Sequence, residues 1–199
     1  MEVEAPRIVQ VGDPVLRAAT AAVDPSAIRT PEIQSLIQGM VAAMHKAPGV
    51  GLAAPQVGVS KRIIVMEDRP EMTAGLPMDV LVEREREPQP LRILINPVMT
   101  MVGAETRDFF EGCLSITGYT AMVTRNREVA VSYLDEKGDA QEWRARGWPA
   151  RVMQHEYDHL ERVLYTDKMI RKSFMSTEEF KVRHGTKLIA DLKQELGIS

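Results

Sequence analysis

Residues 153–160 read MQHEYDHL and place two histidines four positions apart around a glutamate. On a helix, positions i and i+4 lie on the same face, so His155 and His159 would aim their rings at a common point beside Glu156. This H-E-x-x-H arrangement offers two metal ligands and a carboxylate that can act as a general base. The competing interpretation is a solvated helix face, and a third ligand elsewhere in the chain would decide between the two.

The residues around this stretch predict a buried helix. After Gly147, the segment WPARVMQHEYDHLERVL (148–164) has an apolar stripe that includes both histidines, and a proline lies near its start. The stripe consists of Trp148, Val152, His155, His159 and Val163. A buried histidine pair needs a polar partner, and a bound metal ion is the interpretation that this pattern favours.

The length, composition and charge of the chain limit the kinds of protein that it can be. A chain of 199 residues is expected to form a single domain, 1–199, with a substantial core. A hydrophobic fraction of 44% and a net charge of −3 give no reason to expect binding to nucleic acid or to an acidic membrane. No apolar run approaches the roughly 20 residues that span a bilayer, so a soluble protein is expected. The lone cysteine, Cys113, excludes an intramolecular disulfide and suits a reducing compartment.

Other segments predict a mixture of helix and strand. The segment TPEIQSLIQGMVAAMHK (30–46) predicts a helix that Thr30 can cap. The segments RIIVME (62–67) and LRILIN (91–96) predict buried strands, and 127–146 alternates about a DEKGD turn as a hairpin does. Strands followed by a buried helix favour an α+β fold.

Two further segments are predicted to lie outside this core of strands and helices. The excursion DRPEMTAGLPMDVLVEREREPQP (68–90) is rich in proline and charge, which indicates a solvated surface loop. Ser176 and Glu179 form a capping box that predicts a C-terminal helix with an interruption near Gly185. Residues 176–199 are therefore expected to be a helical extension of the domain.

Two candidates could complete the metal site, since catalytic sites commonly use three protein ligands and leave one position for water. In the first, Cys113 supplies a sulfur ligand beside Gly112, whose small size lets the backbone approach a bound group. In the second, Glu178 or Glu179 supplies a carboxylate. Each candidate also has a purely structural explanation. A free cysteine is commonly a buried residue with no ligand role, and acidic residues are favoured in the first turn of a helix. The H-E-x-x-H pattern in the same chain favours Cys113.

The choice of third ligand separates two kinds of hydrolase. A carboxylate would suit a zinc metallopeptidase, which stays as the alternative function. The elongated pattern H-E-x-x-H-x-x-G-x-x-H is not completed, because Arg162 and Tyr165 stand at its glycine and third histidine. A structural zinc module is disfavoured, since such sites are closed by four Cys or His ligands and this chain has one cysteine.

Three separated stretches occur in a fixed order: GVGLAAPQ (49–56), EGCLS (111–115) and QHEYDHL (154–160). Together they closely resemble the peptide deformylases, over about residues 7–170. The resemblance implies an α+β domain in which mixed or antiparallel sheets surround a central metal-binding helix. It also implies the activity, which is removal of the N-formyl group from the N-terminal methionine of nascent polypeptides with release of formate.

The resemblance also assigns roles to residues. It implies that Cys113, His155 and His159 hold a divalent ion, ferrous iron in the cell, which zinc, nickel or cobalt can replace. Glu156 is implied as the general base. The Gln56 side-chain amide and the Leu114 backbone N–H are implied to hold the developing oxyanion.

Further residues are expected to bind the substrate. Gly49 and Gly51 would let an extended peptide pair with this edge of the protein as an added strand. The methionine side chain would enter an apolar pocket, for which the candidates are Val50, Trp148 and Val152. Gly112, next to the cysteine ligand, would lie against the bound peptide.

The partners implied are N-formyl-methionyl nascent peptides, and a transient contact with the ribosome is compatible with that role. The GWPAR segment (147–151) and the long excursion before LRILINP (91–97) look more like the organellar form from plants and animals than like compact bacterial ones. A bacterial protein of this kind would lie in the cytoplasm, and a eukaryotic one inside mitochondria or plastids. Residues 1–16 show no secretory signal, and removal of a transit peptide stays open.

The chain departs from the family pattern at two positions. Arg162 stands where the family usually has a glycine, just after the histidine helix, and Thr117 stands where many members have a proline. The first substitution bears on how the chain leaves the helix, and the second on the rim of the cleft. Neither position is a metal ligand.

Overall fold

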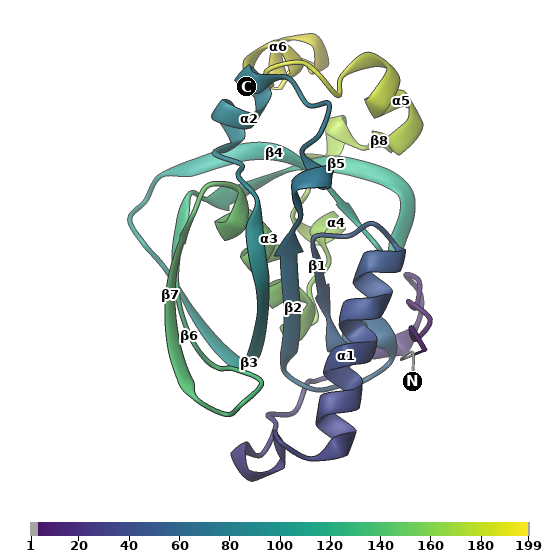
Figure 1. Ribbon diagram of the computed structural model, residues 1–199. Helices are drawn as coiled ribbons and strands as arrows, with labels where there is room; N and C mark the ends of the chain where they lie inside the picture. The colour runs from purple at the N-terminus through teal and green to yellow at the C-terminus, as the bar shows by residue number, and fades with distance from the viewer. Residues whose placement is uncertain (1–3, 199) are drawn as a thin grey trace.

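The computed structural model describes residues 4–198 as an α+β fold with two antiparallel sheets (Figure 1). The five-stranded sheet has the order β1 (Gly51–Ala53), β2 (Ile63–Asp68), β3 (Gln89–Met101), β6 (Glu128–Leu134) and β7 (Ala140–Arg146). The three-stranded sheet has the order β4 (Thr106–Cys113), β5 (Ile116–Asn126) and β8 (Met175–Ser176). The helices are α1 (Pro31–Lys46), α2 (Met78–Arg84), α3 (Trp148–Leu160), α4 (Tyr165–Lys168), α5 (Thr177–Arg183) and α6 (Ile189–Leu196). No helix within residues 4–198 is both long and apolar enough to cross a membrane.

The predictions of one helix, two strands and a hairpin are confirmed, whereas the helix predicted over 148–164 ends at Leu160 and leaves Val163 outside it. Helix α1 occupies the predicted segment, and the Thr30 hydroxyl accepts a hydrogen bond from the Ile33 N–H at its start. The predicted strands correspond to β2 and β3, although β3 extends well beyond the predicted 91–96. The predicted hairpin is β6 paired with β7.

The five-stranded sheet is covered by helices on both faces. Alternate residues of a strand point to opposite faces, and β2 shows this directly. Ile63 and Val65 join the core beneath α1, whereas Ile64 and Met66 join the core beneath α3. Helix α3 therefore lies between the two sheets, with its apolar side on β2, β3, β6 and β7 (Figure 1).

Helix α3 begins where another segment is pressed against it. Gly147, just before the helix, has a φ of 66°, a conformation that favours glycine. A Cβ at this position would lie 2.4 Å from Cβ of Glu85. Glu85 also forms ion pairs with Arg127 and Arg146. The start of α3 is thus fixed by contact with the segment that follows α2.

The prediction that 68–90 is a solvated loop is wrong. The segment contains α2, and Val80 on this helix is fully buried. Asp68 and Arg86 form an ion pair whose side chains are 6% and 8% exposed. These two charges, from opposite ends of the segment, balance each other in the interior, so the segment is an ordered part of the domain.

The C-terminal helices pack onto the outer side of β4 and β5. The break predicted near Gly185 is confirmed, because α5 ends at Arg183 and α6 begins at Ile189. Leu192 of α6 is 1% exposed and packs in a cluster with Phe110 and Met122. At the start of α6, the Ile189 N–H donates to the Glu83 carboxylate of α2 at 3.0 Å, and the two helices lie close together in Figure 1.

The chain leaves α3 through a left-handed residue. Arg162 has a φ of 64° at the position where the resembled pattern has a glycine. Its carbonyl accepts a hydrogen bond of 2.8 Å from the Arg17 guanidinium. The turn that glycine makes without steric cost is therefore made here by an arginine, which carries that cost.

Replacement of Arg162 by glycine should stabilise the protein. Arg162→Gly removes the left-handed strain, and the gain should reach up to about 1 kcal/mol. Arg162→Ala is the control, since it removes the side chain but keeps the Cβ and the strain. The midpoint of urea unfolding measures both variants. A lower midpoint for Arg162→Gly than for Arg162→Ala would contradict the assignment of strain to this residue.

Candidate metal centre and substrate cleft

The structure brings the three predicted ligand residues together. Cys113 ends β4, and His155 and His159 lie one turn apart on α3. Their possible ligand atoms all lie within 4.8 Å of one another. The Cys113 Sγ is 3.3 Å from Nε2 of His159. Within residues 4–198, these three form the group of His, Cys and acidic residues that could hold a metal ion.

The alternative third ligands lie elsewhere. Glu178 and Glu179 occupy the first turn of α5, where Ser176 Oγ accepts a hydrogen bond from the Glu179 N–H at 3.1 Å. Both are exposed, and Glu179 pairs with Arg183 on the same helix. The structure therefore does not bring a carboxylate from this segment to the histidine pair.

The donor set fits a divalent transition metal. One sulfur and two imidazole nitrogens suit zinc, iron, cobalt and nickel. Nδ1 of His155 lies 2.9 Å from the Glu111 carboxylate, so its Nε2 is left for the cluster. Nδ1 of His159 is buried without a hydrogen-bond partner among the described residues.

The pKa values of the two histidines are shifted in opposite directions. Burial lowers the pKa of His155, but hydrogen bonds with Cys113 and Glu111 outweigh it and raise the pKa well above its ordinary value. Burial lowers the pKa of His159 well below that value, and the neighbouring charge on His155 adds to the effect. Protonation of both neighbouring imidazoles is therefore disfavoured. A single positive charge between the two histidines and Cys113 avoids that repulsion.

Glu156 reaches the same place from the next position on α3. Its side chain is buried, and its Oε2 has no hydrogen-bond partner among the described residues. Burial raises its pKa to about 7, against the opposing charge of His155. A Cβ at Gly51 would lie only 2.5 Å from Oε1 of Glu156. Glycine at position 51 therefore leaves the space in which this carboxylate lies, next to the cleft.

Gln56 presents its amide group to the cluster in a fixed orientation. Its Oε1 accepts a hydrogen bond of 2.8 Å from the Ala53 N–H. Its Nε2 is consequently directed towards Cys113 Sγ at 3.5 Å and Ser115 Oγ at 3.3 Å. The Leu114 carbonyl accepts a bond of 3.0 Å from Gln10, whereas the Leu114 N–H donates to none of the described residues.

A cleft of about 830 Å³ opens onto these groups. It is lined by Cys113, His155, Glu156 and Gln56, while His159 lies behind them and is 1% exposed. Leu114 lines the cleft as well, and so do the residues expected to bind substrate: Gly49, Val50, Gly51, Gly112, Trp148 and Val152. The walls include residues that the sequence analysis did not identify: Met72, Arg86, Phe110, Tyr119, Thr177 and Lys181.

The rim of the cleft is tied to the N-terminal segment through Thr117. The Thr117 N–H and hydroxyl both donate to Oε1 of Gln10, at 3.3 and 3.0 Å. A proline at this position has no N–H and could not make the first of these bonds. The departure at Thr117 thus adds contacts at the rim and leaves the ligands in place.

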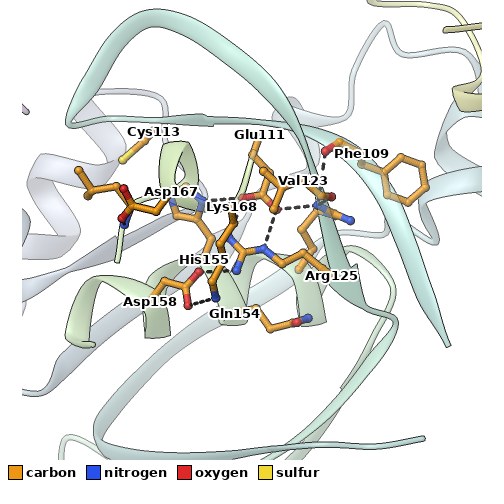
Figure 2. A network of polar contacts seen from close by, with 12 residues as sticks. Phe109, Glu111, Cys113, Val123, Arg125, Gln154, His155, Asp158, Asp167 and Lys168 are labelled. Atoms are coloured by element: carbon orange, nitrogen blue, oxygen red, sulfur yellow. Dashed lines mark hydrogen bonds and ion pairs between the residues drawn. The ribbon is translucent and has the colours of Figure 1, made fainter. Parts of the chain in front are cut away.

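Glu111 lies at the centre of a buried charge network that includes His155 (Figure 2). Its carboxylate accepts hydrogen bonds from Arg125 at 3.0 and 2.9 Å, and from Arg151 at 2.6 Å. Because an ionised carboxylate only accepts, Nδ1 of His155 is the donor in their contact. Burial alone would raise the pKa of Glu111, but His155 and Arg125 hold it well below its ordinary value.

The network continues along α3 and was missed from the sequence. Asp158 accepts hydrogen bonds from Arg125 and from Lys168, and Gln154 pairs with the backbone of Asn126 at both ends of its amide. Arg151 also donates to the backbone carbonyls of Arg107 and Val123. One signal could have pointed to it, since Glu111 lies two positions before the cysteine of the motif.

An α+β domain that brings a cysteine and a histidine pair together at one cleft, as a group that could hold a metal ion, is an arrangement known from small metal-dependent hydrolases. Residues 5–175 match the family model described as polypeptide deformylase. The chain therefore belongs to the polypeptide deformylase family.

The individual relatives agree. The chain is 46% identical over 173 residues to peptide deformylase 1A, chloroplastic, from Solanum lycopersicum, covering 87% of this chain and 62% of the tomato protein. It is 46% identical over 169 residues to peptide deformylase 1 of Streptomyces coelicolor, covering 85% and 75% of the two chains. The chain thus spans less than two thirds of the length of the tomato relative.

Solved structures show the same fold. The Met-Ala-Ser-bound class I type b peptide deformylase from Acinetobacter baumannii superimposes with a TM-score of 0.74 at 30% identity. The match covers 85% of this chain and 100% of the other.

Replacement of Glu111 should weaken both the fold and the metal centre. Glu111→Gln leaves Arg151 without a buried counter-charge and Arg125 with Asp158 alone, which should lower the free energy of unfolding by about 3–5 kcal/mol. It also leaves one neutral acceptor oxygen for Arg125, Arg151 and His155 to share, which weakens the bond that orients His155, so metal affinity should fall roughly 10–100-fold. Urea unfolding and competition with a metal chelator measure the two effects.

Asp108→Asn is the matched control on the same strand. Asp108 pairs with Lys193 near the surface, so its loss should lower the free energy of unfolding by about 1 kcal/mol at most and leave metal affinity unchanged. Equal losses of metal affinity in the two variants would contradict a specific role for Glu111.

Proposed function

We propose that this chain removes the formyl group from the N-terminal methionine of nascent polypeptides and releases formate. Membership of the polypeptide deformylase family supports the proposal. The observation that carries it is the convergence of Glu156, Cys113, His155 and Gln56 at one cleft. The Acinetobacter neighbour, whose bound peptide begins with methionine, is consistent with a substrate of this kind.

Cys113, His155 and His159 are proposed to hold the metal, with α3 as the metal-binding helix at the centre of the fold. Ferrous iron is the proposed ion in the cell, and zinc, nickel or cobalt should replace it in the same donor set. When bound, such an ion lowers the pKa of water and polarises a carbonyl oxygen. The close approach of the three donors supports this assignment.

Glu156 is proposed to manage the proton. A buried carboxylate with a pKa near 7 can accept a proton from the attacking water and later deliver it to the departing amine. Its unpartnered Oε2 leaves one oxygen available for this exchange. The space that Gly51 leaves beside it supports the same role.

Gln56 and Leu114 are proposed to stabilise the oxyanion that forms as water adds to the formyl carbonyl. The Gln56 Nε2 is held in place by the bond between its Oε1 and the Ala53 N–H, so the dipole needs no reorganisation during the reaction. The Leu114 N–H is next to Cys113 and donates to no described residue. Loss of one such donor typically raises a barrier by roughly 2.7–4 kcal/mol.

The peptide is proposed to bind along β1. This strand lies at the edge of the five-stranded sheet and pairs only with β2 there, so an extended peptide can add to its free side. Gly49 and Gly51 would face the peptide from this edge, and Gly112 from the strand β4. The methionine side chain would enter the region lined by Val50, Trp148 and Val152.

The chain is proposed to act as one catalytic domain, 1–199, with 176–199 as a helical extension that packs on β4 and β5. Packing of Leu192 against Phe110 and Met122 supports that organisation. A reducing compartment is proposed: the cytoplasm of a bacterium, or the interior of a mitochondrion or plastid. Transient binding at the ribosome would fit a substrate that is still being synthesised.

Formate release tests the proposed function. Wild-type protein should release formate from formyl-Met-Ala-Ser, and a chelator should abolish the reaction. Glu156→Gln keeps all three proposed ligands but removes the proton acceptor, so it should retain metal and lose at least about a hundredfold in kcat. Cleavage of internal peptide bonds without formate release would instead favour the zinc metallopeptidase, and a fully active Glu156→Gln would exclude the general-base role.

Sensitivity to air tests the proposed ion. A sulfur ligand beside an accessible ferrous ion is open to oxidation, so iron-loaded enzyme should lose activity in air faster than nickel-loaded enzyme prepared in parallel. Cys113→Ser should bind either ion weakly, because a hydroxyl is a poor ligand at neutral pH. Identical decay of the two loaded forms would contradict the ferrous assignment while leaving the proposed reaction untouched.

A further inference from the structure

The segment after β2 contributes an arginine, Arg86, to the wall of the cleft. Arg86 donates from Nε and Nη2 to the two carboxylate oxygens of Asp68, at 2.8 and 2.9 Å. Both side chains are almost completely buried. Paired, two-point contacts of this kind fix the plane of the guanidinium group. Arg86 nevertheless lines the cleft, so a rigid planar cation forms part of its wall.

The guanidinium lies over the ring of Trp148. Its central carbon is 4.8 Å from the ring centroid, and that of Arg84 is 5.6 Å away. Both distances are typical of cation–π contacts. The Trp148 indole N–H has no hydrogen-bond acceptor among the described residues. The orientation of the ring therefore depends on its packing and on these two cations, and not on a hydrogen bond of its own.

The surroundings make Arg86 the stronger of the two contacts. It is closer to the ring, and Asp68 balances its charge. Burial and the neighbouring Arg86 lower the pKa of Arg84 to about 10, so Arg84 lies in a less favourable electrostatic position. The part of the wall that Trp148 forms is thus held principally by the Asp68–Arg86 pair.

We infer that Asp68 and Arg86 are positioning residues that set the specificity of the cleft, by holding Trp148 at the pocket for the first side chain of the substrate. This rests on the proposed function. Trp148 lines the cleft together with Val50 and Val152, and its ring sets how deep and how wide that apolar region is. An unbranched methionine side chain fits a narrow pocket with an aromatic wall. A ring free to turn would admit other shapes.

Arg86→Lys tests the inference. Lysine keeps a positive charge opposite Asp68 but lacks the planar group that stacks on the ring. The measurement is kcat/KM for formate release from formyl-Met-Ala-Ser and from the formyl-Ala and formyl-Phe analogues. The preference for methionine over each analogue should fall by about tenfold, the lower end of the roughly 10–200-fold discrimination that one methylene gives in an apolar pocket.

Arg62→Lys is the matched control. Arg62 lies over the ring of Tyr157 at 5.5 Å, and neither residue lines the cleft or the small pocket beside Trp148. The same substitution on this second stack should leave the preference for methionine unchanged. An equal change in both variants, or a loss of rate in Arg86→Lys that is the same for all three peptides, would overturn the inference and leave Arg86 a purely structural role.

A binding measurement separates this inference from the proposed function. The chain has two tryptophans, so Trp143→Phe leaves Trp148 as the fluorescent reporter. Addition of Met-Ala-Ser should shift its emission, and Arg86→Lys in this background should change the emission of the free protein and reduce the shift by half or more. Unaltered emission on both counts would overturn the inference. Absence of formate release by the wild type would instead overturn the proposed function.

Asp68→Asn provides a second route if Arg86→Lys does not fold. Asparagine keeps an acceptor for the Arg86 guanidinium but removes the charge that balances it. The same loss of preference for methionine is expected, at about two- to fivefold because one hydrogen bond remains. An unchanged preference in a folded Asp68→Asn protein would count against the inference.

Discussion

The Glu111 carboxylate accepts hydrogen bonds from Arg125 on β5 and from Arg151 and His155 on α3. A lone charge at this depth would be strongly destabilising, because the interior solvates it far less well than water does. All three donors are therefore needed to balance the buried charge of Glu111. The requirement holds the small sheet and α3 in one relative position, and it turns the His155 ring so that its second nitrogen faces Cys113.

This constraint explains why α3 can be buried on all sides although its sequence is not uniformly apolar. One side carries Val152 and Met153, which pack against the five-stranded sheet. The opposite side carries Arg151, His155 and Asp158, whose charges are met by partners on β4 and β5. Hydrophobic packing against one sheet leaves the helix free to slide, whereas paired charges against the other specify its register. Buried ion pairs contribute little net stability on average, so specification of position is the more plausible reason for their presence here.

Much of the framework could be predicted from the sequence because short-range patterns determine it. The apolar stripe and cap predicted α1, the alternation about Gly138 predicted the β6–β7 hairpin, and the i, i+4 spacing placed His155 and His159 on one face. Cys113 lies far from the histidines in sequence. The H-E-x-x-H pattern favoured it over Glu178 and Glu179, and the resemblance of three separated motifs then assigned it. Spacing alone left that choice open.

The failures have a common physical origin. Charged residues in a sequence indicate solvent, and most of them are exposed. Asp68, Arg86, Glu111 and Arg125 are instead buried because their partners arrive from other elements of the fold. No local pattern shows such a pairing. The same reason caused the segment with α2 to be assigned to a loop, since Val80 is buried only by tertiary contacts.

The chemistry and the shape of the cleft therefore arise from different parts of the chain. The proposed ligands and Glu156 lie on β4 and α3, two elements fixed by the charges around Glu111. The cleft walls receive Arg86 from the segment after β2, which is anchored through Asp68. They receive Lys181 from α5, which packs through Phe180 on Phe110 of β4. A change in a wall residue can alter which side chains fit without moving the ligands. The converse does not hold, because displacement of α3 moves Trp148 and Val152 together with His155. Substitutions in the cleft wall can therefore change the substrate specificity while the geometry of the proposed metal centre stays the same.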